Sequence, residues 1–570
     1  MRPALLATLL VALLAVPAEG AAVKKLTFQV PVSTPDDAGQ KITLDTDVYL
    51  PAGAPPKGGR PFVEVYHGGG SDKSNTFDAG HAKFFAEHGY VSLIYSQRGN
   101  GNSGGLEAVA GPEEMRDLFD VTHWALTQKF GIDRTRIALT GYSQGGLNTN
   151  LAQAWSGDKR LNPYGIHFAV LEPGNTPDYI ADALIPNHVD KLSVGVGLIE
   201  TYLVGAKAHI APILGKWIAT ESADAVYSTG PANRCDVTSH DTPTSPTLSD
   251  FAARSVGCFA SRMTPPVLWA QAFDDGIFPS NMAISMWRRM PHRLSNHLYL
   301  SMGGHAAPSA PAAVEKDKLR VQLAYLNHYL FNKPLMLPAV IYWTRDPNVK
   351  VPANAFAYPA RSWTRHIAST WPPRGVRETR FALSADGKLT TGQAPAGSLP
   401  LSGEQFDPGS DSVLQAAFSA TPLGANPLAP GATGTSEPGV VAGFATAPFP
   451  ADRELSGPSK LQLSWTPNAQ ETQVAVKLYD RAPDGTLTLL GRAIDGITDG
   501  TPGQATQLSF ATNDYSVLVH KGHQILVTVT AGDASFYKPY AQSGAGGTLT
   551  VGSGSMMTGG GSTITLPLGP

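Results

Sequence analysis

Cysteine is almost absent from this 570-residue chain, which has only Cys235 and Cys258. No cysteine and histidine spacing suits zinc, and the His-Glu-x-x-His pattern is missing, so we expect neither a metal nor a cofactor. Charged residues make up 16% of the chain, and the formal net charge is −3. Without a basic run to neutralise phosphates, nucleic-acid binding is not expected.

Long apolar runs are also missing, so stable membrane insertion is not expected. The N-terminus has a short one: Met1-Arg2-Pro3 precedes the apolar residues 4–16 and the small residues 17–21. This order is typical of a cleaved signal peptide, predicted here over residues 1–20, with cleavage after Ala18 or Gly20. A secreted or periplasmic location follows. In an exported protein, the two cysteines most simply form one local disulfide.

The length predicts at least two domains. Over residues 21–335, short apolar runs alternate with helical stretches, which predicts an α/β sheet covered on both faces. Six strands are expected, at residues 62–66, 91–95, 136–140, 167–171, 267–270 and 298–300, followed by a helix at residues 316–332. The alternation fails at about residues 172–264, where we expect an inserted helical cap.

Residues 336–570 have a different pattern, with short strands separated by Gly, Pro, Asp and Asn. Apolar and polar residues alternate with period two at residues 460–465 and 472–479, and a turn follows at residues 483–485. These features predict a β-sandwich of the jelly-roll type. Residues 391–450, which are rich in Gly, Pro, Ala and Ser, are expected to form long surface loops.

Gly141-Tyr142-Ser143-Gln144-Gly145 is a Gly-x-Ser-x-Gly motif that directly follows the apolar run at residues 136–140. The order of strand, sharp turn and helix is that of a nucleophile elbow, which exposes the serine hydroxyl above the sheet. A second match surrounds Ser103, but it lies in a Gly- and Asn-rich segment without an adjoining strand. Ser143 is therefore the predicted nucleophile.

A serine nucleophile needs a base, and the base needs a third group that orients it. His305 follows the last predicted strand of the first domain, in the chain order of the α/β-hydrolases. The preceding strand ends before two adjacent carboxylates, Asp274 and Asp275. We favour Asp275 as the acid and keep Asp274 as the alternative.

The segment His67-Gly68-Gly69-Gly70 follows the predicted strand that ends at Tyr66. Glycines there allow backbone N–H groups to approach an oxyanion. We predict an oxyanion hole formed by Gly68 together with the N–H of Gln144.

These motifs resemble the X-Pro dipeptidyl-peptidase and cocaine-esterase (CocE/NonD) family of serine hydrolases. The resemblance includes residues 98–105, 141–145, 274–279 and 303–305, as well as 371–373, 381–387 and 478–485 of the second domain. It implies an α/β-hydrolase core, a helical cap and a C-terminal jelly roll. It also implies release of Xaa-Pro dipeptides from peptides, or hydrolysis of a small ester or amide.

This chain departs from the family at two places. Ser96 occupies a position where members often have Asp, and Tyr66-His67-Gly68 replaces a Pro-Tyr pair whose tyrosine donates to the oxyanion. The donor is therefore expected to be backbone, with Tyr66 as a weaker candidate.

A dipeptidyl-peptidase must also anchor a free amino terminus, for which Glu172, Asp178, Asp182 and Glu200 are candidates. Peptidase and esterase activity stay open, as does a binding protein with a degenerate hydrolase core. The oligomeric state is not indicated.

Overall fold

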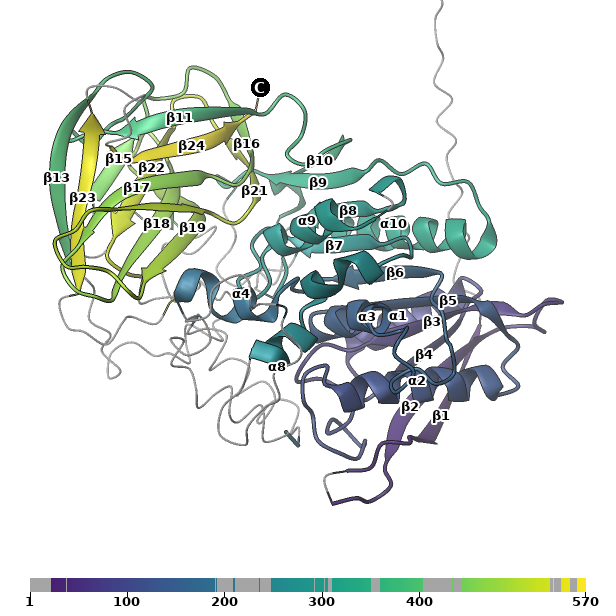
Figure 1. Cartoon of the computed structure of the whole chain (residues 1–570). Coiled ribbons are helices and arrows are strands. Elements are labelled where there is room, and N and C mark those ends of the chain that lie inside the picture. Colours follow the sequence, from purple (N-terminus) through teal and green to yellow (C-terminus); the bar gives the residue numbers. More distant parts are fainter. Residues whose placement is uncertain are drawn as a thin grey trace, which may run out of the picture.

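The computed structural model describes most of the chain (Figure 1). The described residues are 22–36, 38–189, 191, 209–210, 235, 248–291, 293–301, 303–305, 310–349, 359–402, 433–434, 442–533, 537, 545–553 and 561–569. The predicted signal peptide, residues 190, 192–208, 211–234 and 236–247 of the predicted cap, and with them Glu200, lie outside the described residues.

The N-terminal domain contains a mostly parallel sheet with the order β1-β2-β4-β3-β5-β6-β7-β8-β9-β10. Its strands are β1 (Val23–Pro31), β2 (Thr43–Pro51), β3 (Arg60–Tyr66), β4 (Val91–Tyr95), β5 (Ile132–Tyr142), β6 (Val170–Gly174), β7 (Leu268–Ala272), β8 (His297–Ser301), β9 (Val340–Arg345) and β10 (Trp363–Ala368). Strands β3 to β9 are parallel, so their carboxyl ends meet at one edge. Ligands bind at this edge in open α/β sheets.

Helices cover both faces of this sheet, because its central strands are apolar on both sides. One face packs against α1 (Thr76–Glu87) and α10 (Ala312–Phe331), and the other against α2 (Pro112–Thr127), α3 (Gln144–Ala154) and α9 (Ser280–Arg289). Adjacent residues of β3 show this alternation, since Phe62 and Val63 belong to opposite layers.

All six expected strands of this domain are present, and the predicted helix at residues 316–332 corresponds to α10. Strand β6 begins three residues later than expected, at Val170. The antiparallel hairpin of β1 and β2 at the N-terminal edge was not predicted.

The C-terminal domain is a β-sandwich. One layer contains β11 (Arg377–Leu383), β12 (Leu389–Thr390), β13 (Ala394–Ser402), β16 (Arg453–Gly457), β17 (Lys460–Pro467), β20 (Thr506–Ala511), β21 (Tyr515–Val519), β23 (Gly546–Ser553) and β24 (Thr563–Leu568). The other has the order β14 (Thr433–Gly434), β19 (Leu487–Ile497), β18 (Thr472–Arg481), β22 (Gln524–Thr530) and β15 (Ala442–Ala445). An apolar core including Trp465 and Val476 fills the space between them.

The expectation of surface loops throughout residues 391–450 is wrong at β13, seven of whose nine residues pair with β23, and at the short strands β14 and β15. Strand β13 contains two prolines and a glycine. Such residues weaken a central strand but are tolerated beside a register shift, which the structure shows between Ala394 and Gly397.

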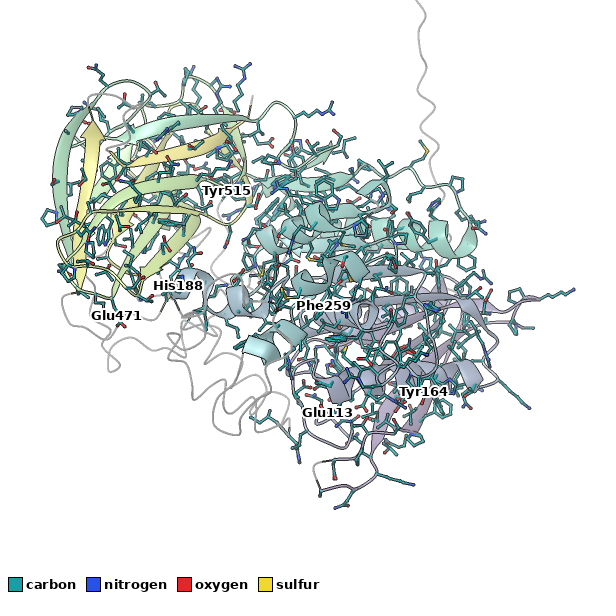
Figure 2. All side chains as sticks on the ribbon, viewed as in Figure 1. Glu113, Tyr164, His188, Phe259, Glu471 and Tyr515 are labelled. Atoms are coloured by element: carbon teal, nitrogen blue, oxygen red, sulfur yellow. A yellow bond between two sulfur atoms is a disulfide. The ribbon has the colours of Figure 1, made fainter. Side chains whose placement is uncertain are left out.

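The two domains share backbone pairing. Strands β9 and β10, which lie beyond the predicted domain boundary at residues 335/336, extend the hydrolase sheet, and β9 also contacts β21 of the sandwich. Tyr515 lies at this junction (Figure 2). A cavity of about 50 Å³ is lined by Tyr515 and Arg492 from the sandwich and by Asp275 from the hydrolase domain. The sandwich therefore reaches the loop that carries the predicted catalytic acid.

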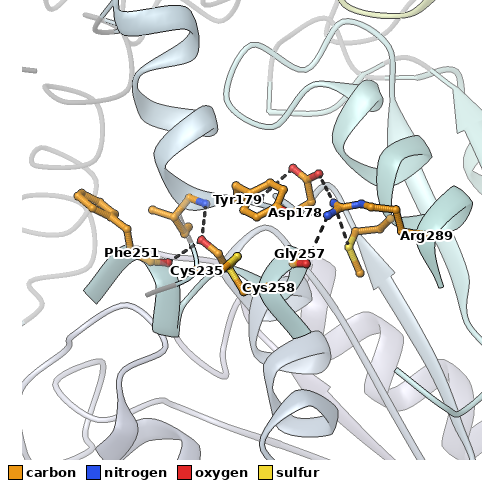
Figure 3. The surroundings of a disulfide bond; sticks show 10 residues. Asp178, Tyr179, Cys235, Phe251, Gly257, Cys258 and Arg289 are labelled. Atoms are coloured by element: carbon orange, nitrogen blue, oxygen red, sulfur yellow. Dashed lines mark hydrogen bonds and ion pairs between the residues drawn. A yellow bond between two sulfur atoms is a disulfide. The ribbon is translucent and has the colours of Figure 1, made fainter. Parts of the chain in front are cut away.

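Between β6 and β7, the described part of the predicted cap includes α4 (Ile180–Leu184) and α8 (Leu248–Ala253). The structure contains a disulfide between Cys235 and Cys258, separated by 23 residues (Figure 3). Within the described part of the chain, no helix is both long enough and apolar enough to cross a bilayer.

Candidate active site

Ser143 lies between β5 and α3 in a strained backbone conformation, with φ 59° and ψ −128°. A positive φ is rare for a residue with a side chain and is maintained only by the surrounding packing. A Cβ on Gly145 would lie 2.3 Å from the carbonyl oxygen of Tyr66, and one on Gly146 would lie 2.5 Å from that of Gly174. Gly145 of the motif and the following Gly146 therefore let the elbow pack against β3 and β6.

The structure brings His305 and Asp275 together. Nδ1 of His305 lies 2.7 Å from Oδ2 of Asp275, whose side chain is fully buried. Oδ1 of Asp275 accepts hydrogen bonds from the backbone N–H groups of Ile277 and Phe278, each at 2.9 Å. The carboxylate is thus held by its own turn, and one oxygen is left for the imidazole. This arrangement fixes the tautomer of a histidine so that Nε2 can accept a proton.

Asp274 has a different partner. Its Oδ1 accepts a hydrogen bond of 2.7 Å from the backbone N–H of Gly303. Asp274 thereby ties its own turn to the loop that carries His305, while Asp275 contacts the imidazole.

The glycine loop, residues 68–70, lies beside the serine. A Cβ built on Gly68 would lie 3.4 Å from Cβ of Ser143 and 3.9 Å from its Oγ. Burial raises the pKa of the Asp78 carboxyl group to about 7, and a hydrogen bond from the backbone of Gly68 opposes part of that rise. The glycine loop thus lies close enough to Ser143 for its N–H groups to remain candidate oxyanion donors.

Tyr66 does not fit the role of a side-chain donor. Its ring is fully buried and packs edge-on against Tyr95, with centroids 5.8 Å apart. Burial, followed by the nearby charge of Glu64, raises the pKa of the Tyr66 hydroxyl well above its ordinary value. The contribution of Tyr66 to the elbow is its backbone carbonyl, against which Gly145 packs.

The carboxylates expected to anchor an amine are largely engaged or buried. Glu172 lies in the middle of β6 and is only 1% exposed, and burial raises its pKa well above the ordinary value. Asp178 receives a 2.8 Å hydrogen bond from Arg289, and burial raises its pKa to about 6 (Figure 3). Asp182, in α4, has electrostatic interactions with Asp178 and Lys191.

Ser103, in the second Gly-x-Ser-x-Gly match, has a structural role. Its Oγ donates a hydrogen bond of 2.6 Å to the carbonyl of Ser96 and accepts one of 2.9 Å from the N–H of Asp45. These two bonds tie the loop after β4 to β2.

Sequence reasoning missed a buried polar network next to the elbow, formed by His67, Gln97, Glu107, Gln144 and Asn148. The position of Gln97, two residues after a predicted strand, was the available signal, since residues at that edge gather around the site. No group of three or more His, Cys, Asp or Glu side chains suited to a metal ion occurs among the described residues.

Two family models match the chain. Residues 39–307 match the X-Pro dipeptidyl-peptidase (S15 family) model, and residues 336–554 match the X-Pro dipeptidyl-peptidase C-terminal non-catalytic domain. None of the curated proteins matches the chain.

Several solved structures share the whole architecture. An aminopeptidase from a marine sediment Thaumarchaeota archaeon has a TM-score of 0.66 and 14% identity, with 97% of this chain and 99% of that chain covered. A CocE/NonD family hydrolase from Staphylococcus aureus has a TM-score of 0.65 and 12% identity, with 97% of both chains covered. An α-amino acid ester hydrolase has a TM-score of 0.66 and 16% identity, with 96% and 97% covered. At these identities, the likeness shows the fold.

The family matches and the fold define a serine hydrolase, an enzyme with an α/β-hydrolase domain followed by a β-rich domain. The chain belongs to the X-Pro dipeptidyl-peptidase (S15) family, whose catalytic and C-terminal models match residues 39–307 and 336–554, and it shares the fold of a CocE/NonD family hydrolase. Membership in this enzyme family argues against the alternative of a binding protein with a degenerate core.

Proposed function

We propose that the enzyme hydrolyses amide or ester bonds through an acyl-enzyme on Ser143, with His305 as the general base and Asp275 as its orienting acid. The observation that carries this proposal is the occurrence of a strained serine elbow together with the 2.7 Å contact between His305 and Asp275. A serine hydroxyl is a weak nucleophile until an oriented base removes its proton.

In the first step, Oγ of Ser143 forms a bond to the substrate carbonyl carbon, and its proton moves to Nε2 of His305. The carbonyl oxygen becomes an oxyanion, which the N–H of Gln144 and an N–H of the glycine loop stabilise. The intermediate expels the amine or alcohol, which takes the proton from His305, and an ester remains on Ser143. Water then gives a proton to His305 and attacks this ester. Oγ of Ser143 leaves and takes the proton back from His305, which releases the acid and restores the free enzyme.

The substrate class that we propose is a small peptide with proline in second position, from which the enzyme releases an Xaa-Pro dipeptide. The support is that both matching family models describe X-Pro dipeptidyl-peptidases, one for each domain.

A second candidate, hydrolysis of small esters, is favoured by the state of two of the four candidate anchors. Glu172 is buried within the sheet, and Asp178 is paired with Arg289. Neither carboxylate is therefore placed to receive a substrate ammonium group, which a dipeptidyl-peptidase must bind.

The test is hydrolysis of an Ala-Pro anilide, its N-acetylated form and a short-chain nitrophenyl ester. Ser143→Ala is the inactive control, and Ser103→Ala is the matched serine control that should keep activity. Cleavage of the free anilide but not of its acetylated form supports the dipeptidyl-peptidase. Cleavage of the ester alone supports the esterase, and turnover that survives in Ser143→Ala rejects the proposed mechanism.

We also propose that the mature enzyme is exported and starts near residue 21. The support is the predicted signal peptide and the disulfide, which persists in oxidising compartments. N-terminal sequencing of protein expressed with its own leader should yield Glu19 or Ala21 from the exported fraction. Recovery of Met1 in that fraction would contradict cleavage.

A further inference from the structure

Gln97 is a buried side chain to which the mechanism above assigns no role. It is the second residue after β4 and is 1% exposed. Strand β3 lies between β4 and β5 in the parallel part of the sheet. Gln97 is therefore placed beside the residues that follow β3, which are His67 and the glycine loop, and near the residues that follow β5, which are Ser143 and Gln144.

On one side, Gln97 binds the start of the glycine loop. Its backbone N–H donates to Nε2 of His67 at 2.9 Å, and its side-chain Nε2 donates to the carbonyl of His67 at 3.0 Å. These two bonds fix both the imidazole of His67 and the peptide group that joins His67 to Gly68.

The imidazole of His67 in turn holds the next peptide group, which joins Gly68 to Gly69. Burial lowers the pKa of His67 to about 4, so the ring is neutral at physiological pH. Since Nε2 accepts from Gln97, the proton is on Nδ1, which donates to the carbonyl of Gly68 at 2.8 Å. A peptide group is planar, so holding the Gly68 carbonyl also fixes the direction of the Gly69 N–H.

On the other side, Gln97 binds the first turn of α3. Its Oε1 accepts hydrogen bonds from Nε2 of Gln144 at 3.2 Å and from Nδ2 of Asn148 at 2.5 Å. Nε2 of Gln144 also donates to Oε1 of Glu107 at 2.6 Å. A single amide group therefore joins the glycine loop, through its donor, to the residue after the nucleophile, through its acceptor.

We propose that Gln97 is a positioning residue whose side-chain amide fixes the distance between two oxyanion donors, an N–H group of the glycine loop and the N–H of Gln144. This inference rests on the proposed function, because an oxyanion hole requires acyl transfer. Gln97 acts through His67 and α3, and preorganised donors of this kind contribute to the rate only while their geometry is held.

The test is Gln97→Met, which keeps the size of the side chain and removes its amide group. Loss of one oxyanion donor typically costs about 10²–10³-fold in kcat, so displaced donors should cost about 10- to 100-fold. We expect kcat to fall by this factor while KM changes by less than about threefold, since the substrate is bound in its ground state by other contacts. Gln97→Glu keeps the acceptor and loses the donor to His67, and should show the same selective loss.

The matched control is Gln153→Met in α3, the helix that Gln97 contacts. Nε2 of Gln153 donates to the carbonyl of Arg262 at 3.0 Å, away from the glycine loop. This variant should lose a similar amount of thermal stability and keep its kcat. A purely structural role for Gln97 predicts the same behaviour for the two positions.

Folded Gln97→Met or Gln97→Glu enzyme with kcat within threefold of the wild type would overturn the inference, even if its melting temperature falls. If Ser143→Ala is inactive in the same experiment, the proposed function stands and only the role of Gln97 is wrong. If the wild type shows no turnover that depends on Ser143, the proposed function itself fails.

Discussion

Asp275→Asn separates the role of the orienting acid from the packing of its loop. The asparagine has the shape of the aspartate, and its side chain can take two orientations. In the first, its oxygen keeps the 2.9 Å hydrogen bonds from the N–H groups of Ile277 and Phe278. Its NH₂ group then faces Nδ1 of His305, where the carboxylate accepted at 2.7 Å.

The flipped orientation is disfavoured, because it turns the NH₂ group toward two backbone N–H donors. Leaving two buried donors unsatisfied costs about 1–3 kcal/mol each. The first orientation therefore dominates, and it forces Nδ1 of His305 to become an acceptor. The ring proton moves to Nε2, which can then no longer take the proton of Ser143.

A wrong tautomer of this kind lowers kcat by about 10⁴-fold, which corresponds to about 5 kcal/mol of transition-state stabilisation. The assay is the steady-state rate on the substrate that the wild type cleaves best, with the melting temperature measured in parallel. Asp274→Asn is the matched control: it keeps an oxygen for the Gly303 N–H and should lose less than about tenfold. Near-normal activity of Asp275→Asn, with the large loss in Asp274→Asn instead, would refute the assignment.

Three further predictions concern stability. Gly145→Ala should destabilise the enzyme by at least about 2 kcal/mol in chemical denaturation, because its Cβ would lie 2.3 Å from the Tyr66 carbonyl oxygen. Gly157→Ala is the control: the space around Gly157 is open, so the free energy of unfolding should change little. Equal effects would contradict the packing of the elbow. Burial raises the pKa of Glu64 to about 8, above its unfolded value, so its contribution to stability is complete below about pH 4.5 and is lost as the pH rises through 8. The stability of Glu64→Gln relative to the wild type should therefore rise by about 1.4 kcal/mol per pH unit between pH 5 and 8, and a pH-independent difference would show that Glu64 is ionised in the fold. Reduction of the Cys235–Cys258 disulfide, which spans 23 residues, should lower the free energy of unfolding by roughly 3 kcal/mol. Calorimetry with and without reductant measures the change. An unaltered melting temperature would argue against the bond.

The parts of the site that the sequence predicts are those whose residues lie together in one short segment of the chain. The elbow needs a strand, a turn and a helix in direct succession, so its glycines and Ser143 are visible together. His305 and the pair of Asp274 and Asp275 likewise follow strands that could be recognised. Which of the two carboxylates contacts the imidazole depends on the turn at residues 275–278, whose N–H groups bind Asp275.

Features that depend on contacts distant in sequence could not be predicted. Glu172 was expected at the start of the cap, but β6 begins three residues later than the apolar run suggests and places this side chain in the sheet. The role that we propose for Gln97 depends on two contacts between segments distant in sequence. Strand β4 lies beside β3, and Gln144 of α3 donates a hydrogen bond to Gln97. The prolines of β13 give it a weak strand propensity, so the sequence did not predict it. The strand forms because pairing with β23 outweighs this weak propensity.

The most direct test of the central claim is the site of covalent modification by a serine-directed fluorophosphonate, located by peptide mass spectrometry. The account predicts one modified residue, Ser143, and no modification of the Ser143→Ala variant. An unmodified wild type, or modification of Ser103 instead, would contradict the assignment of Ser143 as the nucleophile.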